Sequence, residues 1–156
     1  MATATFSQVL SGALDTAVAG ATMNALANAA YALGAAVNNT PTAGTTVSYD
    51  MGDLTITLSS AVTTGAGSPY ITVWVLPAVD GTNYPTPPGA SGAAAPLGLS
   101  YSFPMVASVS TSTIVCPNIP IPPYNFKVMV QNNLGIAFPA TNTSTCQMQR
   151  KTVASW

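Results

Sequence analysis

Few side chains of this 156-residue chain could carry acid–base, nucleophilic or metal chemistry. The acidic residues are Asp15, Asp50, Asp53 and Asp80, and the chain contains neither Glu nor His. The absence of His excludes His metal ligation and any nucleophile that depends on a His base, such as a Ser-His-Asp or Cys-His system. Carboxylates are therefore the groups on which a catalytic or metal-binding hypothesis would have to depend.

Asp50, Asp53 and Asp80 are the carboxylates for which such a hypothesis can be framed. A calcium loop needs several oxygen ligands at a defined spacing, which Asp50 and Asp53 do not match. A glycosidase needs two carboxylates flanking the scissile bond, and nothing else in the sequence supports a hydrolase. Turn formation and capping explain these residues more simply. We therefore expect no catalytic, cofactor-binding or metal-binding residue and no enzyme activity, with a small hydrolase as the last-ranked alternative.

The scarcity of charge is the next feature. Charged residues make up 4% of the chain and the net charge is −1, whereas charged residues are roughly a quarter of an ordinary soluble domain. Three cations cannot neutralise a run of phosphates, so we expect no nucleic-acid partner. A surface solvated by uncharged polar groups loses little free energy when a partner covers it. The composition thus favours a subunit of a homo-oligomer or larger assembly, and a compact neutral sandwich is the alternative.

Two further patterns bear on the compartment. No Lys or Arg precedes Lys127, so the sequence predicts no secretory signal. No apolar run of roughly 18 residues is present, so we expect no membrane partner. The chain is expected to be made in a cytosol. Cys116 and Cys146 are then predicted to be free and buried, with a disulfide as the alternative.

Residues 2–37 are rich in Ala and contain no Pro, unlike the rest of the chain. Phe6, Leu10, Ala13 and Ala17 recur three or four positions apart, as on one face of a helix. Glycines weaken this pattern, and a stripe made largely of Ala buries too little surface to stabilise a lone helix. We predict an N-terminal arm over residues 1–40, helical or extended, that docks on the rest of the protein or on a neighbour.

Residues 41–156 are predicted to form one β-sandwich domain. Leu54, Ile56 and Leu58 alternate with polar residues, as in a half-buried strand. The strongest strand is expected at residues 70–77, where β-branched and aromatic residues predict burial on both faces. Further strands are expected within residues 99–109, 113–116, 124–131 and 145–153. Seven or eight strands separated by turn signals predict a mainly β fold, an antiparallel sandwich of the jelly-roll type.

A long Pro-rich loop at residues 80–96 supplies most of the candidate interface. Loops of this length in compact domains are usually functional, whereas Asp80 and Gly81 at its start are expected to form a structural turn. Trp156 could anchor in a neighbour, and Trp74 is expected to pack in the core. The candidate interface residues are Tyr84, Pro85, Pro87, Pro88 and Trp156.

The tyrosines leave a different function open. A platform of aromatic rings would suit a carbohydrate-binding module, although the polar and charged residues that bind sugar hydroxyls are scarce here. The tyrosines concerned are Tyr31, Tyr49, Tyr70, Tyr84, Tyr101 and Tyr124.

Two segments together resemble small structural proteins of tailed bacteriophages. The first runs from YITVWVLP at residues 70–77 through DGTNYP at residues 80–85, and the second is IPIPPYNFKVMVQNNLG at residues 119–135. The resemblance covers about half of the chain, and jelly-roll decoration or cement proteins of phage heads are the nearest functional class. It implies a multicopy virion component on the capsid surface, assembled in the host cytoplasm, with no catalytic residues and no cofactor.

The partners implied are the major capsid protein and further copies of the same chain. The expected function is stabilisation of a phage head through subunit–subunit contacts. A glycan-binding adhesin and a tail or neck structural protein are the alternatives, the latter because the Ala-rich arm is unlike a compact decoration protein.

Overall fold

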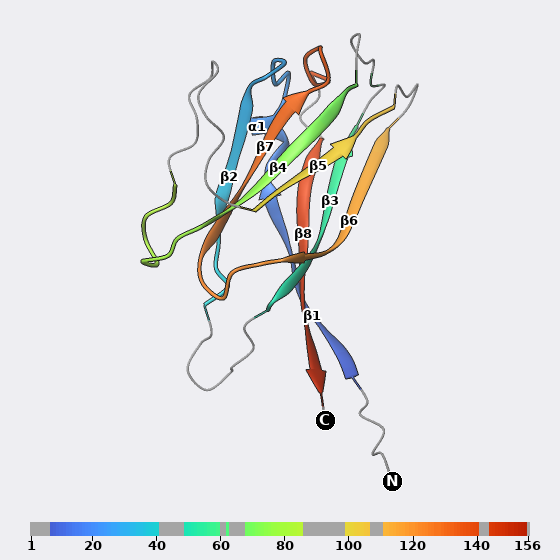
Figure 1. Ribbon diagram of the computed structural model, residues 1–156. Helices are drawn as coiled ribbons and strands as arrows, with labels where there is room; N and C mark the ends of the chain where they lie inside the picture. The colour runs from blue at the N-terminus through green and yellow to red at the C-terminus, as the bar shows by residue number, and fades with distance from the viewer. Residues whose placement is uncertain are drawn as a thin grey trace.

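The computed structural model describes residues 7–40, 49–59, 62, 68–85, 99–106, 111–140 and 144–155 (Figure 1). These residues form eight strands and one short helix. In chain order they are β1 (Ser7–Val18), α1 (Gly20–Met23), β2 (Tyr31–Val37), β3 (Met51–Leu58), β4 (Tyr70–Pro77), β5 (Leu99–Pro104), β6 (Ser112–Pro120), β7 (Phe126–Asn133) and β8 (Thr145–Ser155). The prediction of a mainly β fold is confirmed.

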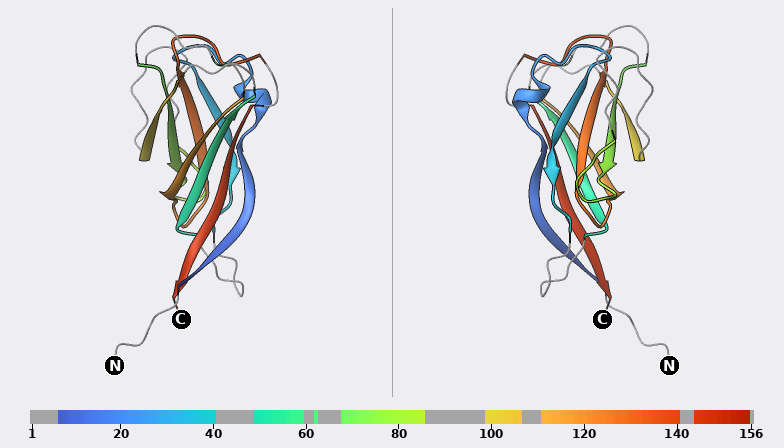
Figure 2. Two further views of the ribbon diagram at one scale, coloured as in Figure 1. Left: turned by 90° about the vertical axis from the view of Figure 1, so that its right-hand side faces the viewer. Right: turned by 90° about the vertical axis from the view of Figure 1, so that its left-hand side faces the viewer.

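The strands form two four-stranded antiparallel sheets that pack face to face (Figure 2). One sheet has the order β1-β8-β3-β6 and the other has the order β2-β7-β4-β5. Four of the pairs are nested: β1 pairs with β8, β2 with β7, β3 with β6 and β4 with β5. The chain therefore pairs as one long hairpin would, with that hairpin folded over into two layers. The predicted antiparallel β-sandwich is confirmed.

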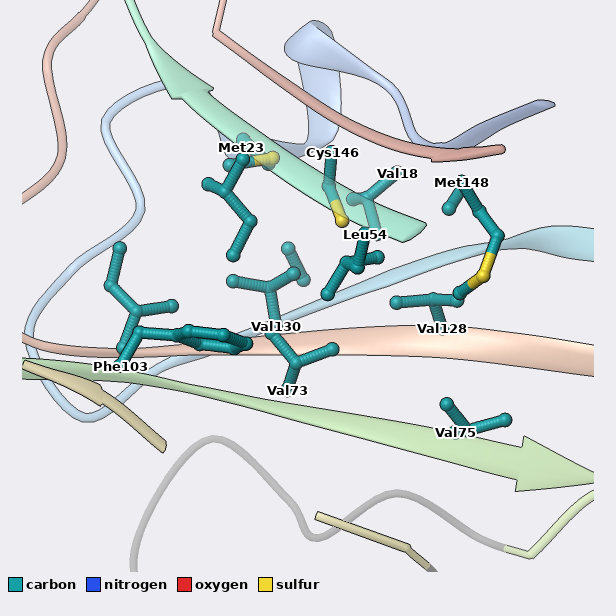
Figure 3. Close-up of a cluster of buried hydrophobic side chains, with 14 of the residues drawn as sticks. Val18, Met23, Leu54, Val73, Val75, Phe103, Val128, Val130, Cys146 and Met148 are labelled. Carbon is teal, nitrogen blue, oxygen red and sulfur yellow. The ribbon is translucent and has the colours of Figure 1, made fainter. Parts of the chain in front are cut away.

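The core lies between the two sheets, where each strand contributes every second side chain. In β3, Leu54, Ile56 and Leu58 are fully buried and alternate with half-buried polar residues. Val73 and Val75 of β4 face Leu54 (Figure 3) and belong to the same buried cluster as the three β3 residues. Continuous apolar contact between two such layers is the main stabilising contribution to a sandwich.

The strand β4 is buried on both faces, as its near-continuous apolar sequence predicts. Its other face carries Trp74 and Leu76, which pack with Met129 of β7 in a second cluster. The ring of Tyr31 lies 5.8 Å from that of Trp74, measured between centroids. Trp74 is thus a packing residue, as expected.

Of the two conformations predicted for the N-terminal arm, the extended one is present and the helical one is wrong for Ser7–Val18, which form β1. The reason lies in two bulges. The pairing of β1 with β8 shifts register between Ser11 and Leu14 and again between Thr16 and Val18, each time with one extra residue on β1. Each bulge interrupts the two-residue period of a strand. The remaining apolar spacing then resembles that of a helix.

The region predicted as an arm contributes an edge strand to each sheet. β1 pairs with β8 and β2 pairs with β7, so both strands hydrogen-bond with the segment that follows residue 40. Gly34 of β2 lies so close to the backbone of β1 that a Cβ there would overlap the Ala17 carbonyl oxygen. The two sheets therefore meet closely at this edge. The boundary at residue 40 stays a prediction.

The paired ends of β1 and β8 project beyond the rest of their sheet (Figures 1 and 2). The pairing of β3 with β8 ends at Met51 and Lys151, whereas β1 and β8 stay paired out to Ser7 and Ser155. Among the described residues, no third strand joins 7–10 and 152–155, which therefore form a two-stranded ribbon.

Candidate interaction site

Two of the five predicted interface residues, Tyr84 and Pro85, are described, and both are half-buried. The ammonium group of Lys127, on β7, lies 4.5 Å from the centre of the Tyr84 ring. This cation–π contact occupies one face of the ring within the protein. Tyr84 is consequently part of the packing between the β4 turn and β7. The other three predicted interface residues lie outside the described residues: Pro87, Pro88 and Trp156.

The turn before Tyr84 is built around Asp80. Its Oδ1 accepts hydrogen bonds from the backbone N–H of Thr82 at 2.9 Å and of Asn83 at 2.6 Å, and its Oδ2 accepts one from the Asn83 side chain. Gly81 adopts φ = 81°, which glycine reaches without steric strain. These bonds confirm the structural role of Asp80. They also hold the pKa of its carboxyl at about 2, with the Asn83 backbone N–H as the largest cause.

Asp53 is engaged by other partners. Its Oδ1 accepts hydrogen bonds from Nζ of Lys151 at 2.6 Å and from the backbone N–H of Asn118 at 2.9 Å. The bond from Lys151 is the main cause of the lowered pKa of Asp53. Asn118 has φ = 59° and lies where β6 bulges opposite β3, so Asp53 stabilises that bulge. Nowhere in the described parts of the chain do three Asp, Glu, Cys or His side chains gather as metal ligands.

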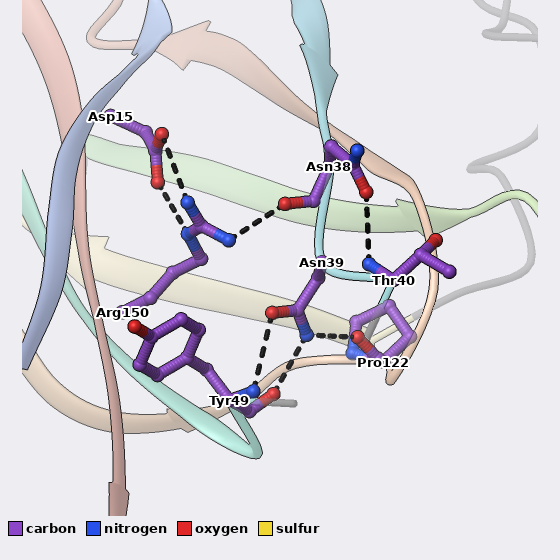
Figure 4. A network of polar contacts seen from close by, with 7 residues as sticks. All are labelled: Asp15, Asn38, Asn39, Thr40, Tyr49, Pro122 and Arg150. Carbon is purple, nitrogen blue, oxygen red and sulfur yellow. Dashed lines mark hydrogen bonds and ion pairs between the residues drawn. The ribbon is translucent and has the colours of Figure 1, made fainter. Parts of the chain in front are cut away.

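Arg150 forms the most connected polar cluster (Figure 4). Its Nε donates to Asp15 at 2.6 Å, its second terminal nitrogen also reaches Asp15, and its first donates to the carbonyl oxygen of Asn38 at 2.7 Å. The guanidinium also lies 5.1 Å from the centre of the Tyr49 ring. These contacts join β8 to β1 and to the segments after β2 and before β3. Its role is structural.

The two cysteines are free, as predicted. Cys146 is fully buried, and burial raises its pKa to about 12. The prediction of burial is wrong for Cys116, which is half-buried because it lies on β6 at the edge of the sheet. β3 runs between the two cysteine-bearing strands, and two strand spacings of about 4.8 Å exceed the Cα separation that a disulfide allows.

Two hollows mark the surface of the described residues. The larger, of about 380 Å³, is apolar and lies near the end of β4 and the Pro-rich connection between β6 and β7. It is lined by Val75, Pro77, Leu99, Pro120, Ile121, Pro122 and Tyr124. The smaller, of about 240 Å³, is mostly polar and lies at the start of β4 and the end of β7. We call the smaller one the polar hollow; it is lined by Asn28, Ser68, Pro69, Tyr70, Asn133, Leu134 and Gly135.

Sequence reasoning did not find the polar hollow. Asn133 and Gly135 lie in the second segment of the bacteriophage resemblance, and Asn28 lies in the region predicted as an arm. The available signal in the sequence is the Asn-rich turn at the end of β7. This strand pairs with β4, and Asn133 there lies opposite Tyr70. Using that signal requires the strand pairing, which the sequence alone did not supply.

Within the described residues, the one helix has four residues, and none is long and apolar enough to cross a membrane. In comparisons with protein families, curated proteins and solved structures, no family model, no protein and no structure matches this chain.

Proposed function

We propose that this protein is a structural virion protein, a decoration or cement protein that stabilises a phage head through contacts with the major capsid protein and with copies of itself. The observation that carries the proposal is the near absence of free charge. Four of the seven charged residues form two ion pairs, Asp15 with Arg150 and Asp53 with Lys151. A surface with so few unpaired ions is desolvated at little electrostatic cost when neighbours cover it.

The projecting ribbon of β1 and β8 supports a role in assembly. A two-stranded ribbon is marginally stable in water, because each strand has a partner on one side only. Within the part of the chain that the structure describes, no third strand lies beside residues 7–10 and 152–155. A neighbouring subunit that packs on this ribbon would supply the contacts that the ribbon lacks. A protein that bridges two capsomers would make such contacts.

The edge strand β6 supports self-association. Its stretch from Ser112 to Cys116 carries no charged residue and no Pro, and Val115 in it is 58% exposed. Isolated proteins usually protect such an edge with charges, prolines or bulges. On β6 the prolines and the bulge begin only at Pro117. The unprotected half is therefore suited to antiparallel pairing with the same strand of a second copy.

We further infer that the sandwich is a jelly roll. The nested pairing of eight strands over two sheets supports this assignment, since the jelly roll is an eight-stranded double sheet. Jelly rolls serve capsid and lectin functions alike, so the fold by itself favours neither.

Copy number tests the function most directly. Quantitative mass spectrometry of purified particles from the virus that encodes the chain would count copies against the major capsid protein. Hundreds of copies per particle are expected for a head decoration protein. Six or twelve copies would indicate a tail or neck protein instead, and the absence of the protein from particles would overturn the proposal.

A further inference from the structure

The polar hollow lies where β4 starts and β7 ends, and this end of the sandwich is opposite the projecting ribbon of β1 and β8 (Figure 1). Three segments far apart in sequence form it: the connection between α1 and β2 supplies Asn28, the start of β4 supplies Tyr70, and the end of β7 supplies Asn133. Tyr70 and Asn133 are cross-strand partners. The position of the ring beside the amide is therefore fixed by the ladder between β4 and β7.

Tyr70 differs from every other tyrosine of the chain. The ring of Tyr31 packs on Trp74, that of Tyr49 lies under Arg150, and that of Tyr84 lies under Lys127. Tyr101 and Tyr124 are both half-buried; the first packs on the core and the second lines the apolar hollow. Tyr70 is 41% exposed and borders a polar hollow. Of the six rings proposed for a platform, that of Tyr70 is thus the one that is exposed beside a polar hollow.

The two amides of the hollow are held in place and keep complementary groups unused. Asn28 accepts a hydrogen bond from the backbone N–H of Gly135 at 2.8 Å through Oδ1, which leaves its Nδ2 as a donor. Asn133 donates through Nδ2 to Thr72 at 3.3 Å and to Gln131 at 3.2 Å, which leaves its Oδ1 as an acceptor. A donor and an acceptor beside an exposed ring are available on preorganised side chains.

We propose that the polar hollow binds one neutral pyranose unit of a glycan. The apolar C–H face of the sugar would lie on the Tyr70 ring, and its hydroxyl groups would accept from Nδ2 of Asn28 and donate to Oδ1 of Asn133. The lining contains no charged residue, so nothing in it would compensate a phosphate, a sulfate or a sugar carboxylate. The neutral ring and the neutral amides favour an uncharged ligand. The volume of about 240 Å³ suits a single sugar unit.

The site goes beyond the proposed structural function and does not depend on it. A decoration protein that carries it would expose a sugar-binding end away from the ribbon formed by its two chain ends. Loss of sugar binding would leave the copy number in particles unchanged, so the two proposals fail separately.

Nuclear magnetic resonance on the full chain tests the site. The probes are glucose, galactose, mannose and N-acetylglucosamine as methyl glycosides, titrated against the ¹⁵N-labelled protein, with sialic acid and inorganic phosphate as anionic probes. We expect at least one neutral glycoside to shift the amide resonances of Tyr70, Asn133 and Gly135 saturably, with millimolar affinity. No shift with any neutral glycoside, or shifts with the anions alone, would overturn the proposal.

Matched variants separate a binding site from a general effect on folding. Tyr70→Ala should weaken the affinity at least about tenfold, the value of one lost aromatic contact, whereas Tyr70→Phe should keep most of it because the ring remains. Tyr84→Ala removes a ring that Lys127 already covers and should leave the affinity unchanged. Equal binding by Tyr70→Ala and wild type, with both variants folded by circular dichroism, contradicts the assignment.

Discussion

At the scale of single residues, the stability of the sandwich depends on a few polar side chains that join distant segments. Arg150 contacts three segments at once, and its side chain is 14% exposed. Lys151, its neighbour on β8, donates a hydrogen bond to Asp53 through its side chain. The two adjacent cations therefore form a natural comparison of a networked ion pair with a simple one.

Replacement of Arg150 by Met should lower the free energy of unfolding by about 2–3 kcal/mol, since it removes the guanidinium that donates to both the Asp15 carboxylate and the Asn38 carbonyl. Replacement of Lys151 by Met should lower it by only about 1 kcal/mol, because Asp53, whose side chain is 32% exposed, keeps the backbone N–H of Asn118 as a donor. Urea denaturation of both variants measures the difference. Equal losses would mean that the contacts with Asn38 and Tyr49 add nothing.

Asp80 predicts a pH dependence at the same scale. Its pKa falls from the ordinary value of 3.8 to about 2 in the folded protein, so the folded carboxyl releases its proton more readily than the unfolded one. The resulting stabilisation is present above the unfolded pKa and is lost as the pH falls through about 2. Asp53, with its pKa also lowered by Lys151, acts in the same direction.

The test is the midpoint of thermal unfolding, followed by circular dichroism across this acidic range. Asp80→Asn keeps an acceptor but does not titrate, so its midpoint should fall less steeply with acid than that of the wild type. Asp50→Asn is the matched control, because Asp50 is an exposed carboxylate outside the β4 turn. Parallel curves for wild type and Asp80→Asn would contradict the prediction.

At the scale of elements, the close approach of β1 and β2 closes one edge of the sandwich. A Cβ on Gly34 would overlap the carbonyl oxygen of Ala17 and lie 3.1 Å from that of Val128. Both neighbours are backbone atoms, which cannot move away by a change of side-chain rotamer. Gly34→Ala should therefore lower the free energy of unfolding by about 1–3 kcal/mol through overpacking.

Gly52→Ala is the matched control for Gly34→Ala. A Cβ there would meet the thioether of Met148, a flexible side chain that can change rotamer, and the nearest backbone atom is at an ordinary 3.6 Å. This variant should lose less than about 1 kcal/mol, because Ala also reduces the entropy of the unfolded chain. If the two variants have the same denaturant midpoint, the backbones of β1 and β2 do not approach closely enough to exclude a Cβ at residue 34.

The edge of β6 predicts a surface for self-association. Val115→Lys places a charge in the middle of the unprotected stretch and should weaken self-association at least about tenfold, as edge lysines do in natural sheets. Val79→Lys changes another exposed valine, in the turn after β4, and should have no effect. Sedimentation velocity over a concentration series compares them. Unchanged association of the Val115 variant would remove β6 from the interface.

The elements also show how far the sequence determines the fold. The bounds of β4 could be predicted to the residue, because β-branched and aromatic residues fill it and Pro77 ends it. β1 could not, because its two bulges replace strand alternation with a spacing that resembles a helix. The polar hollow could not either, since Asn28, Tyr70 and Asn133 carry no shared spacing and meet only through pairing between distant strands.

At the scale of the whole molecule, the decisive property is that attraction between charged groups of this protein and its partner would contribute little to the free energy of assembly. Asp50, Asp80 and Lys127 are the charged residues left outside the two ion pairs, and Lys127 is covered by contact with Tyr84. Attraction between exposed ions is screened beyond about 10 Å at 0.1 M salt, whereas apolar burial and backbone hydrogen bonds are not screened. Any contact that this surface makes should therefore depend little on ionic strength.

Attachment of the purified protein to phage heads that lack it measures this property. Between low salt and about 1 M NaCl, where the screening length falls to about 3 Å, the apparent affinity should change by less than about threefold. An assembly held by ion pairs would instead lose affinity steeply over the same range, as protein contacts with polyanions do. A steep loss would show that charged groups of the partner dominate the contact, and a monomer that attaches to no particle at any salt concentration would exclude a role in the shell.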